Sequence, residues 1–169
     1  MSTILDPVAV VRITDIDQHA LSNLLVRFGL LLERVGDAQE IPGSYWGECE
    51  AGLVEHRLYW RGDTPVHSVL HEACHFICMD EARRRGLNRD AGGDDPEENA
   101  VCYLQIVLSD HIAGFGREQL MRDMDAWGYS FRLGSTRAWF ENDAEDAREW
   151  LVRHDVTTPD GRLTWKCRA

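Results

Sequence analysis

Lysine is almost absent from this 169-residue chain: Lys166 is the only one, and nearly all of the positive charge is arginine. Lysine chemistry is therefore excluded from any site that does not contain Lys166. Basic residues are also too few to balance the acidic ones, which leaves a formal net charge of −11. Because so acidic a chain is repelled by polyanions, we expect neither nucleic acid nor an anionic membrane surface as a partner.

Long apolar runs and paired cysteines are missing as well. No stretch reaches the ~20 apolar residues that cross a bilayer, and residues 1–6 lack the basic and apolar regions of a secretory signal. The five cysteines form no CxxC pair, and their number without a signal sequence suits reduced thiols in a reducing compartment. These absences predict a cytoplasmic protein that does not associate with membranes.

The length and the hydrophobic content of 44% suit one core, so residues 1–169 are predicted to form a single domain of the α+β class. Its metal-site core is expected at about 44–112 and a helical extension at about 116–169. Periodicity and turn residues predict the individual elements. They are an amphipathic helix at 15–35, a β-hairpin at 51–60, helices at 118–127, 136–140 and 144–152, and a hairpin turn at 159–161.

The feature most specific to a chemical function is His71-Glu72-Ala73-Cys74-His75, which has the HExxH spacing of zinc-dependent hydrolases. Residues four apart lie on one face of a helix, so the imidazoles of His71 and His75 can bind one ion. Glu72 projects beside them, where its carboxylate can take a proton from a metal-activated water that attacks a carbonyl.

A helix is predicted around this motif. Thr64 is a suitable N-cap, Pro65 suits the first helical position, and Gly86 is a suitable stop after three arginines. A catalytic zinc takes three protein ligands and leaves a fourth position for water or substrate, so one further ligand is required.

The third ligand is expected on a second helix over 95–108, with Asp95 as its N-cap. The metzincin pattern is excluded, because it requires glycine and histidine where this chain has Cys78 and Glu81. Glu97 and Glu98 lie in the first turn of the second helix, and both are candidates.

The run Glu97-Glu98-Asn99-Ala100 resembles the gluzincin metallopeptidases, whose third ligand is a glutamate on a separate helix, followed three residues later by a small residue. The resemblance covers roughly residues 44–112 and is closest to the compact ImmA/IrrE-type minimal metallopeptidases. It implies a Zn²⁺-dependent hydrolase that cleaves a peptide bond in a peptide or protein substrate, with Glu72 as general base. Family members often carry an acid four residues after the ligand, where this chain has Val101 or Cys102.

Two arguments about the third ligand point in different directions. The small Ala100 favours Glu97, because two helices that carry ligands for one ion must approach closely. A ligand at Glu98 would instead place Cys102 and Gln105 on the inward stripe, where an amide can orient a ligand histidine. Both glutamates therefore stay open.

The candidates for the oxyanion donor are Tyr103, Tyr45 and His67, in that order. The side chain of His67 is otherwise expected to be exposed to solvent. Two other hypotheses compete with the peptidase. One is a deformylase-like amidase in which the Cys49 thiolate is a ligand, and the other is a non-catalytic regulatory or binding protein that holds a structural metal.

Overall fold

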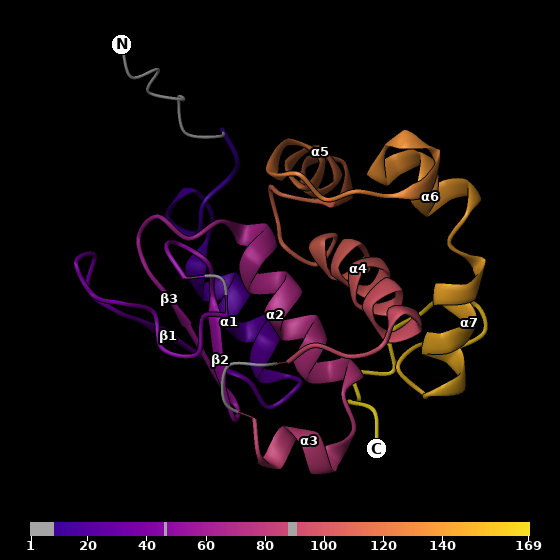
Figure 1. Cartoon of the computed structure of the whole chain (residues 1–169), viewed down its shortest axis with the longest axis horizontal. Helices are drawn as coiled ribbons and strands as arrows, with labels where there is room; N and C mark the ends of the chain where they lie inside the picture. The colour runs from indigo at the N-terminus through magenta and orange to yellow at the C-terminus, as the bar shows by residue number, and fades with distance from the viewer. Residues whose placement is uncertain (1–8, 46, 88–90) are drawn as a thin grey trace.

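The computed structural model describes residues 9–45, 47–87 and 91–169, and it confirms an α+β fold. A small sheet lies on one side of α2 (Val66–Cys78) and α4 (Asp95–Ser109) lies on the other, with α7 (Glu145–Arg153) packed beyond α4 (Figure 1). None of the helices in the described ranges is both long and apolar enough to cross a membrane. The other elements are η1 (Ile13–Asp15), α1 (Gln18–Val26), β1 (Leu31–Arg34), β2 (Gly52–Val54), β3 (Arg57–Trp60), α3 (Glu81–Arg85), α5 (Arg117–Trp127), η2 (Arg132–Gly134) and α6 (Thr136–Asn142).

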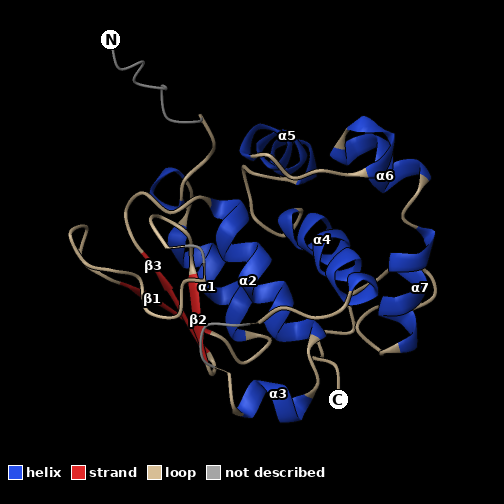
Figure 2. Cartoon of the chain, in the orientation of Figure 1, coloured by secondary structure: helices blue, strands red, loops and turns tan. Residues whose placement is uncertain are grey.

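The sheet has the strand order β1-β3-β2, and its three strands lie together at one edge of the molecule (Figure 2). β2 pairs antiparallel with β3, which confirms the hairpin predicted at 51–60. The directly opposed Leu53 and Leu58 are fully buried, so this hairpin contributes to the core beneath α2.

The long N-terminal helix predicted at 15–35 is wrong in its second half. α1 begins after Asp17, whose side chain accepts hydrogen bonds from the first-turn backbone, and it ends at Val26. Gly29, with φ of +84°, then turns the chain in a conformation that few other residues adopt. Leu31–Arg34 continues as β1 and pairs in parallel with β3, a long-range contact that overrides the apolar helical period.

The single helix predicted through to Gly86 is divided in two. α2 ends at Cys78, because Met79 has an extended backbone with ψ of 156°. Asp80 then caps α3, accepting a hydrogen bond from the backbone nitrogen of Arg83 at 2.9 Å. The motif helix therefore stops one turn after its second histidine.

The predicted starts of α2 and α4 are each displaced by one residue. Thr64 does not cap α2, since its Oγ1 accepts from the Arg61 backbone nitrogen at 2.9 Å and Pro65 holds the N-cap position. Asp94, rather than Asp95, caps α4 and accepts from the backbone of its first turn. The helices predicted in the C-terminal part are confirmed as α5, α6 and α7, and an antiparallel bridge between Thr157 and Leu163 closes the predicted turn.

Gly52 provides a test of this packing. A Cβ there would lie 1.9 Å from the carbonyl oxygen of Pro42 and 2.6 Å from the backbone nitrogen of Ser44. Gly52→Ala must push the 42–44 segment away from β2, so we expect the free energy of unfolding to fall by about 1–3 kcal/mol. Urea unfolding followed by tryptophan fluorescence measures the change.

The matched control is Gly86→Ala, because a Cβ at Gly86 meets nothing within 4 Å, and a change within about 0.5 kcal/mol is expected there. Equal effects of the two substitutions would contradict the packing argument.

Candidate metal centre

Burial along α2 singles out two residues. His71 and Glu72 are partly exposed, whereas the other residues of the helix, including His75, are buried. The sheet covers one side of the helix and α4 the other. The part of α2 that reaches solvent therefore carries the first histidine and the carboxylate of the HExxH motif.

Three side chains converge at this position. The Nε2 atoms of His71 and His75 lie 3.1 Å apart. Glu98 on α4 places Oε1 3.2 Å from Nε2 of His71 and Oε2 3.3 Å from Nε2 of His75. Two ligands bonded tetrahedrally at about 2.0–2.1 Å from a zinc ion are separated by about 3.3 Å. Each imidazole nitrogen therefore lies at about that separation from the other nitrogen and from one oxygen of Glu98, and the three residues form a group that could hold a metal ion.

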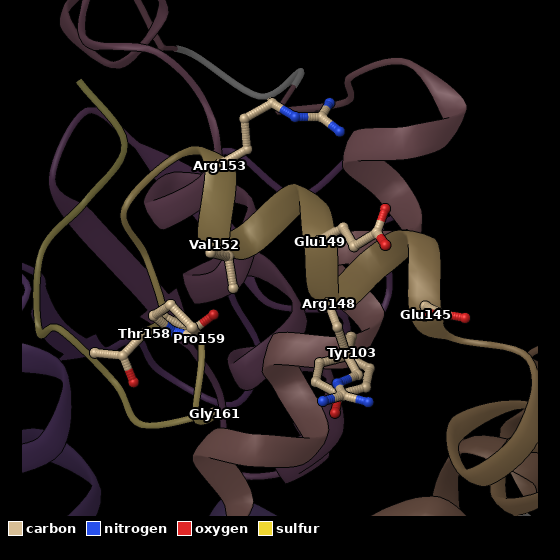
Figure 3. A pocket seen from close by; sticks show the side chains of 10 residues that line it. Tyr103, Glu145, Arg148, Glu149, Val152, Arg153, Thr158, Pro159 and Gly161 are labelled. Atoms are coloured by element: carbon tan, nitrogen blue, oxygen red, sulfur yellow. The ribbon is translucent and has the colours of Figure 1, made fainter.

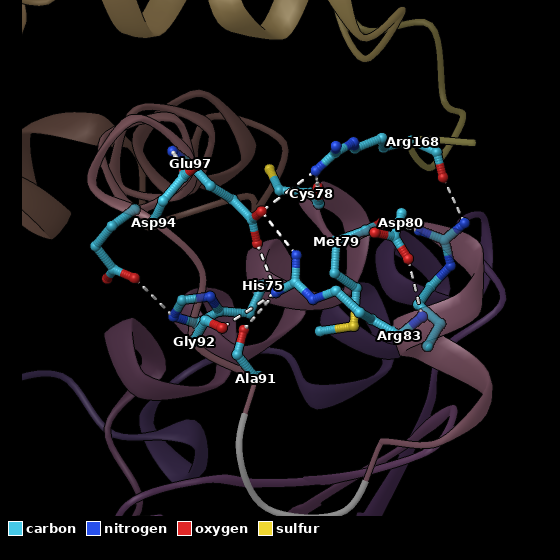
Figure 4. A network of polar contacts seen from close by, with 12 residues as sticks. His75, Cys78, Met79, Asp80, Arg83, Ala91, Gly92, Asp94, Glu97 and Arg168 are labelled. Atoms are coloured by element: carbon cyan, nitrogen blue, oxygen red, sulfur yellow. Dashed lines mark hydrogen bonds and ion pairs between the residues drawn. The ribbon is translucent and has the colours of Figure 1, made fainter.

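Of the two glutamates that the sequence left open, the structure brings Glu98, and not Glu97, to the histidines. The carboxylate of Glu97 is directed instead to the guanidinium groups of Arg83 and Arg168 (Figure 4). The argument from the small Ala100 favoured Glu97, the glutamate that the structure leaves outside the histidine cluster. Ala100 is fully buried, but a close approach of the two helices does not determine which glutamate faces the histidines.

Gln105 orients the first histidine. Its Oε1 lies 3.1 Å from Nδ1 of His71, and its Nε2 donates to the backbone carbonyl of His67 at 2.8 Å. The bond from Nε2 to a carbonyl fixes the orientation of the amide, so its oxygen faces His71 and accepts the Nδ1–H proton. That tautomer leaves the Nε2 lone pair of His71 directed at Glu98 and His75, as a metal ligand requires. This contact agrees with the sequence argument that a ligand at Glu98 would place Gln105 on the inward face of the helix, where its amide can orient a histidine.

Charges in the cluster affect one another strongly. Burial raises the pKa of Glu98, but the hydrogen bond from His71 and the nearby His75 outweigh it, so the pKa lies below its ordinary value. Burial raises the pKa of Glu72 to about 7; Glu50 and Glu98 add to the rise and His71 opposes it. Burial opposes protonation of His71, yet Tyr129, Cys102 and Glu98 together raise its pKa well above the ordinary value.

Glu50 is a site residue that the motif did not reveal. Its Oε1 accepts from Nε1 of Trp127 at 2.8 Å, and its Oε2 accepts from the hydroxyl of Ser68. Ser68 lies one helical turn before Glu72, on the same face of α2. A second carboxylate is therefore fixed beside the motif by neutral donors from α2 and α5. Since Glu50 and Trp127 are far apart in sequence, no local pattern could have paired them.

Tyr103, the first candidate for an oxyanion donor, lies elsewhere. Its ring stacks on Phe140 with centroids 4.7 Å apart. It also lines a pocket of about 430 Å³ between α4, α7 and the C-terminal turn, and Arg148 is among the other lining residues (Figure 3). The structure therefore does not bring Tyr103 to the histidine cluster.

His67 is fully buried, which corrects the expectation of a solvated side chain. Its Nδ1 lies 3.2 Å from the hydroxyl of Tyr129, and its ring packs on Trp127 with centroids 4.9 Å apart. The Tyr129 ring also meets the His71 ring edge-on, with centroids 5.6 Å apart. Tyr129 thus packs against both histidines, a role that its position after Gly128 did not suggest.

The remaining sequence candidates stay outside the cluster. Cys49 is half-buried and does not belong to the metal-capable group among the described residues. Burial and the nearby carboxylates of Glu50 and Asp63 raise the pKa of the Cys49 thiol, which disfavours the thiolate that a metal binds. Tyr45 is 59% exposed in the loop before β2. Trp46, which precedes Cys49 closely, lies outside the described residues.

Comparison with known proteins adds no identification. No protein-family model matches the chain, and no match was found among curated proteins or among solved structures. Functional inference therefore depends on the geometry of the site itself.

The buried His67 predicts a pH dependence of stability. Burial lowers the pKa of His67 to about 3, whereas an unfolded histidine titrates near 6.5. Below about pH 6.5 the unfolded chain takes up a proton that folded His67 refuses, so this residue makes stability fall with falling pH, by up to ~1.4 kcal/mol per pH unit.

We expect His67→Asn to remove that contribution, because asparagine keeps a polar partner for Tyr129 and does not titrate in this range. Urea unfolding of metal-free protein between pH 7 and pH 5 gives the comparison. The stability of the unaltered protein relative to His67→Asn should decline steadily as the pH falls. Parallel curves for the two proteins would show that His67 is protonated in the folded state or does not titrate as described.

Proposed function

We propose that this protein is a zinc-dependent hydrolase that cleaves an amide bond in a peptide or protein substrate in the cytoplasm. The observation that carries the proposal is the convergence of His71, His75 and Glu98 from two separate helices, at the part of α2 that reaches solvent. Glu72 is adjacent to the first ligand and shares its exposure. Metal donors and a carboxylate base are thus together where a substrate has access.

The donor set fits zinc, since two imidazoles and one carboxylate are a ligand combination of catalytic zinc sites. Zinc bound there supplies Lewis acidity, which polarises a substrate carbonyl and makes water a better nucleophile at neutral pH. His71, His75 and Glu98 would hold the ion, and Gln105 fixes the ring of His71. Glu72 accepts the proton of the attacking water and delivers it to the nitrogen of the leaving amine.

A non-catalytic protein with a structural metal is the second candidate. Structural zinc sites are normally closed by four protein ligands, whereas catalytic sites use three. The metal-capable group among the described residues has three members, and Glu72 is not one of them. This donor count supports catalysis over a purely structural role.

Zinc content tests the ligand assignment. We expect about one zinc per chain in the purified protein by elemental analysis, and loss of that zinc in both His75→Ala and Glu98→Ala, because each removes one of three donors. Asp95→Ala is the matched control: it removes an exposed carboxylate from the same helical turn and should keep the zinc. Full zinc occupancy in Glu98→Ala would rule out this ligand set.

Replacement of Glu72 separates the two candidates. Glu72→Gln keeps the side-chain shape and removes the base, so zinc content should stay at one per chain while hydrolysis of a peptide library falls by roughly 10²–10⁴-fold. Glu141→Gln, at an exposed position of α6, is the control and should retain turnover. Unchanged turnover in Glu72→Gln would refute the mechanism, and an absence of hydrolysis in the unaltered zinc-loaded protein would favour the structural role.

A further inference from the structure

Glu97 is the most deeply buried carboxylate beside the metal-capable group, with 3% of its surface exposed. Arg83 donates to it from both terminal guanidinium nitrogens: Nη1 lies 2.8 Å from Oε2 and Nη2 lies 2.9 Å from Oε1. Arg168 adds a third contact, with Nη1 3.3 Å from Oε2. Figure 4 shows the carboxylate between the two guanidinium groups. Such bidentate pairing fixes the orientation of the carboxylate as well as its position.

The ion pairs of Glu97 also affect the direction in which Glu98 points. The two residues are neighbours in the first turn of α4 and point about 100° apart around its axis, since a helix has 3.6 residues per turn. Holding the Glu97 carboxylate therefore sets the rotation of that turn. In the rotation observed, Glu98 faces His71 and His75.

Space around Glu97 is also restricted. A Cβ added at Gly93 would lie 2.4 Å from the Glu97 carboxylate. Arg83 is itself held by the backbone carbonyl of Gly92, 3.1 Å from Nη2. The loop before α4 thus encloses the carboxylate and leaves it little room to reorient.

Arg168 ties the same carboxylate to the other ligand helix. Its backbone nitrogen donates to the carbonyl of Ile77 at 2.9 Å, and its guanidinium donates to the carbonyl of Cys78 at 3.3 Å. Arg84 donates to the carbonyl of Arg168 and to that of Met79. The C-terminal segment therefore bridges the end of α2, just after His75, and the start of α4, just before Glu98.

We propose that Arg168, through its contact with Glu97, is a positioning residue for the metal site, which holds Glu98 toward the histidines and so sets the affinity for zinc. The inference rests on the proposed metal site but concerns affinity rather than hydrolysis. Groups that orient metal ligands from outside typically change metal affinity by about 10–100-fold. Arg168 contacts Glu97, Ile77 and Cys78, and we infer that its effect on zinc is indirect and passes through Glu97 to Glu98.

A double-mutant cycle on zinc binding tests the inference. The dissociation constant for zinc is measured by competition with a chromogenic chelator in the unaltered protein, Arg168→Ala, Glu98→Ala and the double variant. We expect Arg168→Ala to weaken zinc binding by about 10–100-fold when Glu98 is present. In the Glu98→Ala background, where only the two histidines bind, the same substitution should change the constant by less than about 3-fold, since its effect requires Glu98.

Arg162→Ala is the matched control, because it removes an arginine from the same C-terminal segment whose ion pair with Asp160 is exposed. It should leave zinc affinity unchanged. If Arg168→Ala fails to fold, as judged by circular dichroism, Glu97→Gln takes its place in the cycle, because it keeps the shape of the side chain and removes its charge.

Each outcome decides the matter. Equal weakening in both backgrounds would show that Arg168 acts on the fold or on His75, which overturns the inference while the metal site stands. Unchanged affinity in Arg168→Ala does the same. A failure of the unaltered protein to bind zinc at all overturns the proposed function and this inference with it.

Discussion

The packing of α2 between the sheet and α4 is the constraint on which the rest of the structure depends. This helix is buried along nearly its whole length, and only His71 and Glu72 reach solvent. Burial of its apolar residues contributes to the driving force for assembling the strands and helices around it. The same packing aligns α4 beside the motif, so one arrangement accounts for both the core and the meeting of His71, His75 and Glu98.

Around α2, acidic side chains are kept apart by different partners. Glu97 is neutralised by arginines, Glu98 faces histidines, and Glu50 accepts hydrogen bonds from neutral donors. A carboxylate that is already paired with arginine has little tendency to bind a cation, whereas one that faces imidazoles can exchange their protons for a metal. Two adjacent glutamates of the same chemical type are thereby placed in opposite electrostatic surroundings.

Local patterns predicted what depends on local structure. The HExxH segment forms a helix, the 51–60 segment forms a hairpin, and three C-terminal helices stand where their periodicity placed them. Prediction failed where contacts between residues far apart in the sequence determine the structure. The pairing of β1 with β3 ended the N-terminal helix early. Which glutamate faces the histidines depends on the rotation of α4, and that rotation is connected to Arg168, 71 positions after Glu97.

Other members of the site could be recognised only once the fold was known. Tyr129 follows an ordinary helix end at Gly128, and nothing in its neighbourhood marks it as a partner of His67. Gln105 was accessible from the sequence, because it lies seven residues after Glu98 on one helical face. Periodicity thus identified contacts within a helix face, while contacts between elements required the three-dimensional arrangement.

The contacts of the C-terminal segment have a consequence for the entropic cost of folding. The metal-capable residues lie within one short stretch of chain, on two consecutive long helices, so loop closure between them has a small entropic cost. The contacts around them, from Trp127 to Glu50 and from Arg168 to Ile77 and Glu97, close longer loops, and each doubling of loop length adds about 0.6 kcal/mol to the entropic cost. The contacts that surround the metal-capable residues therefore cost more entropy to close than the approach of those residues to one another.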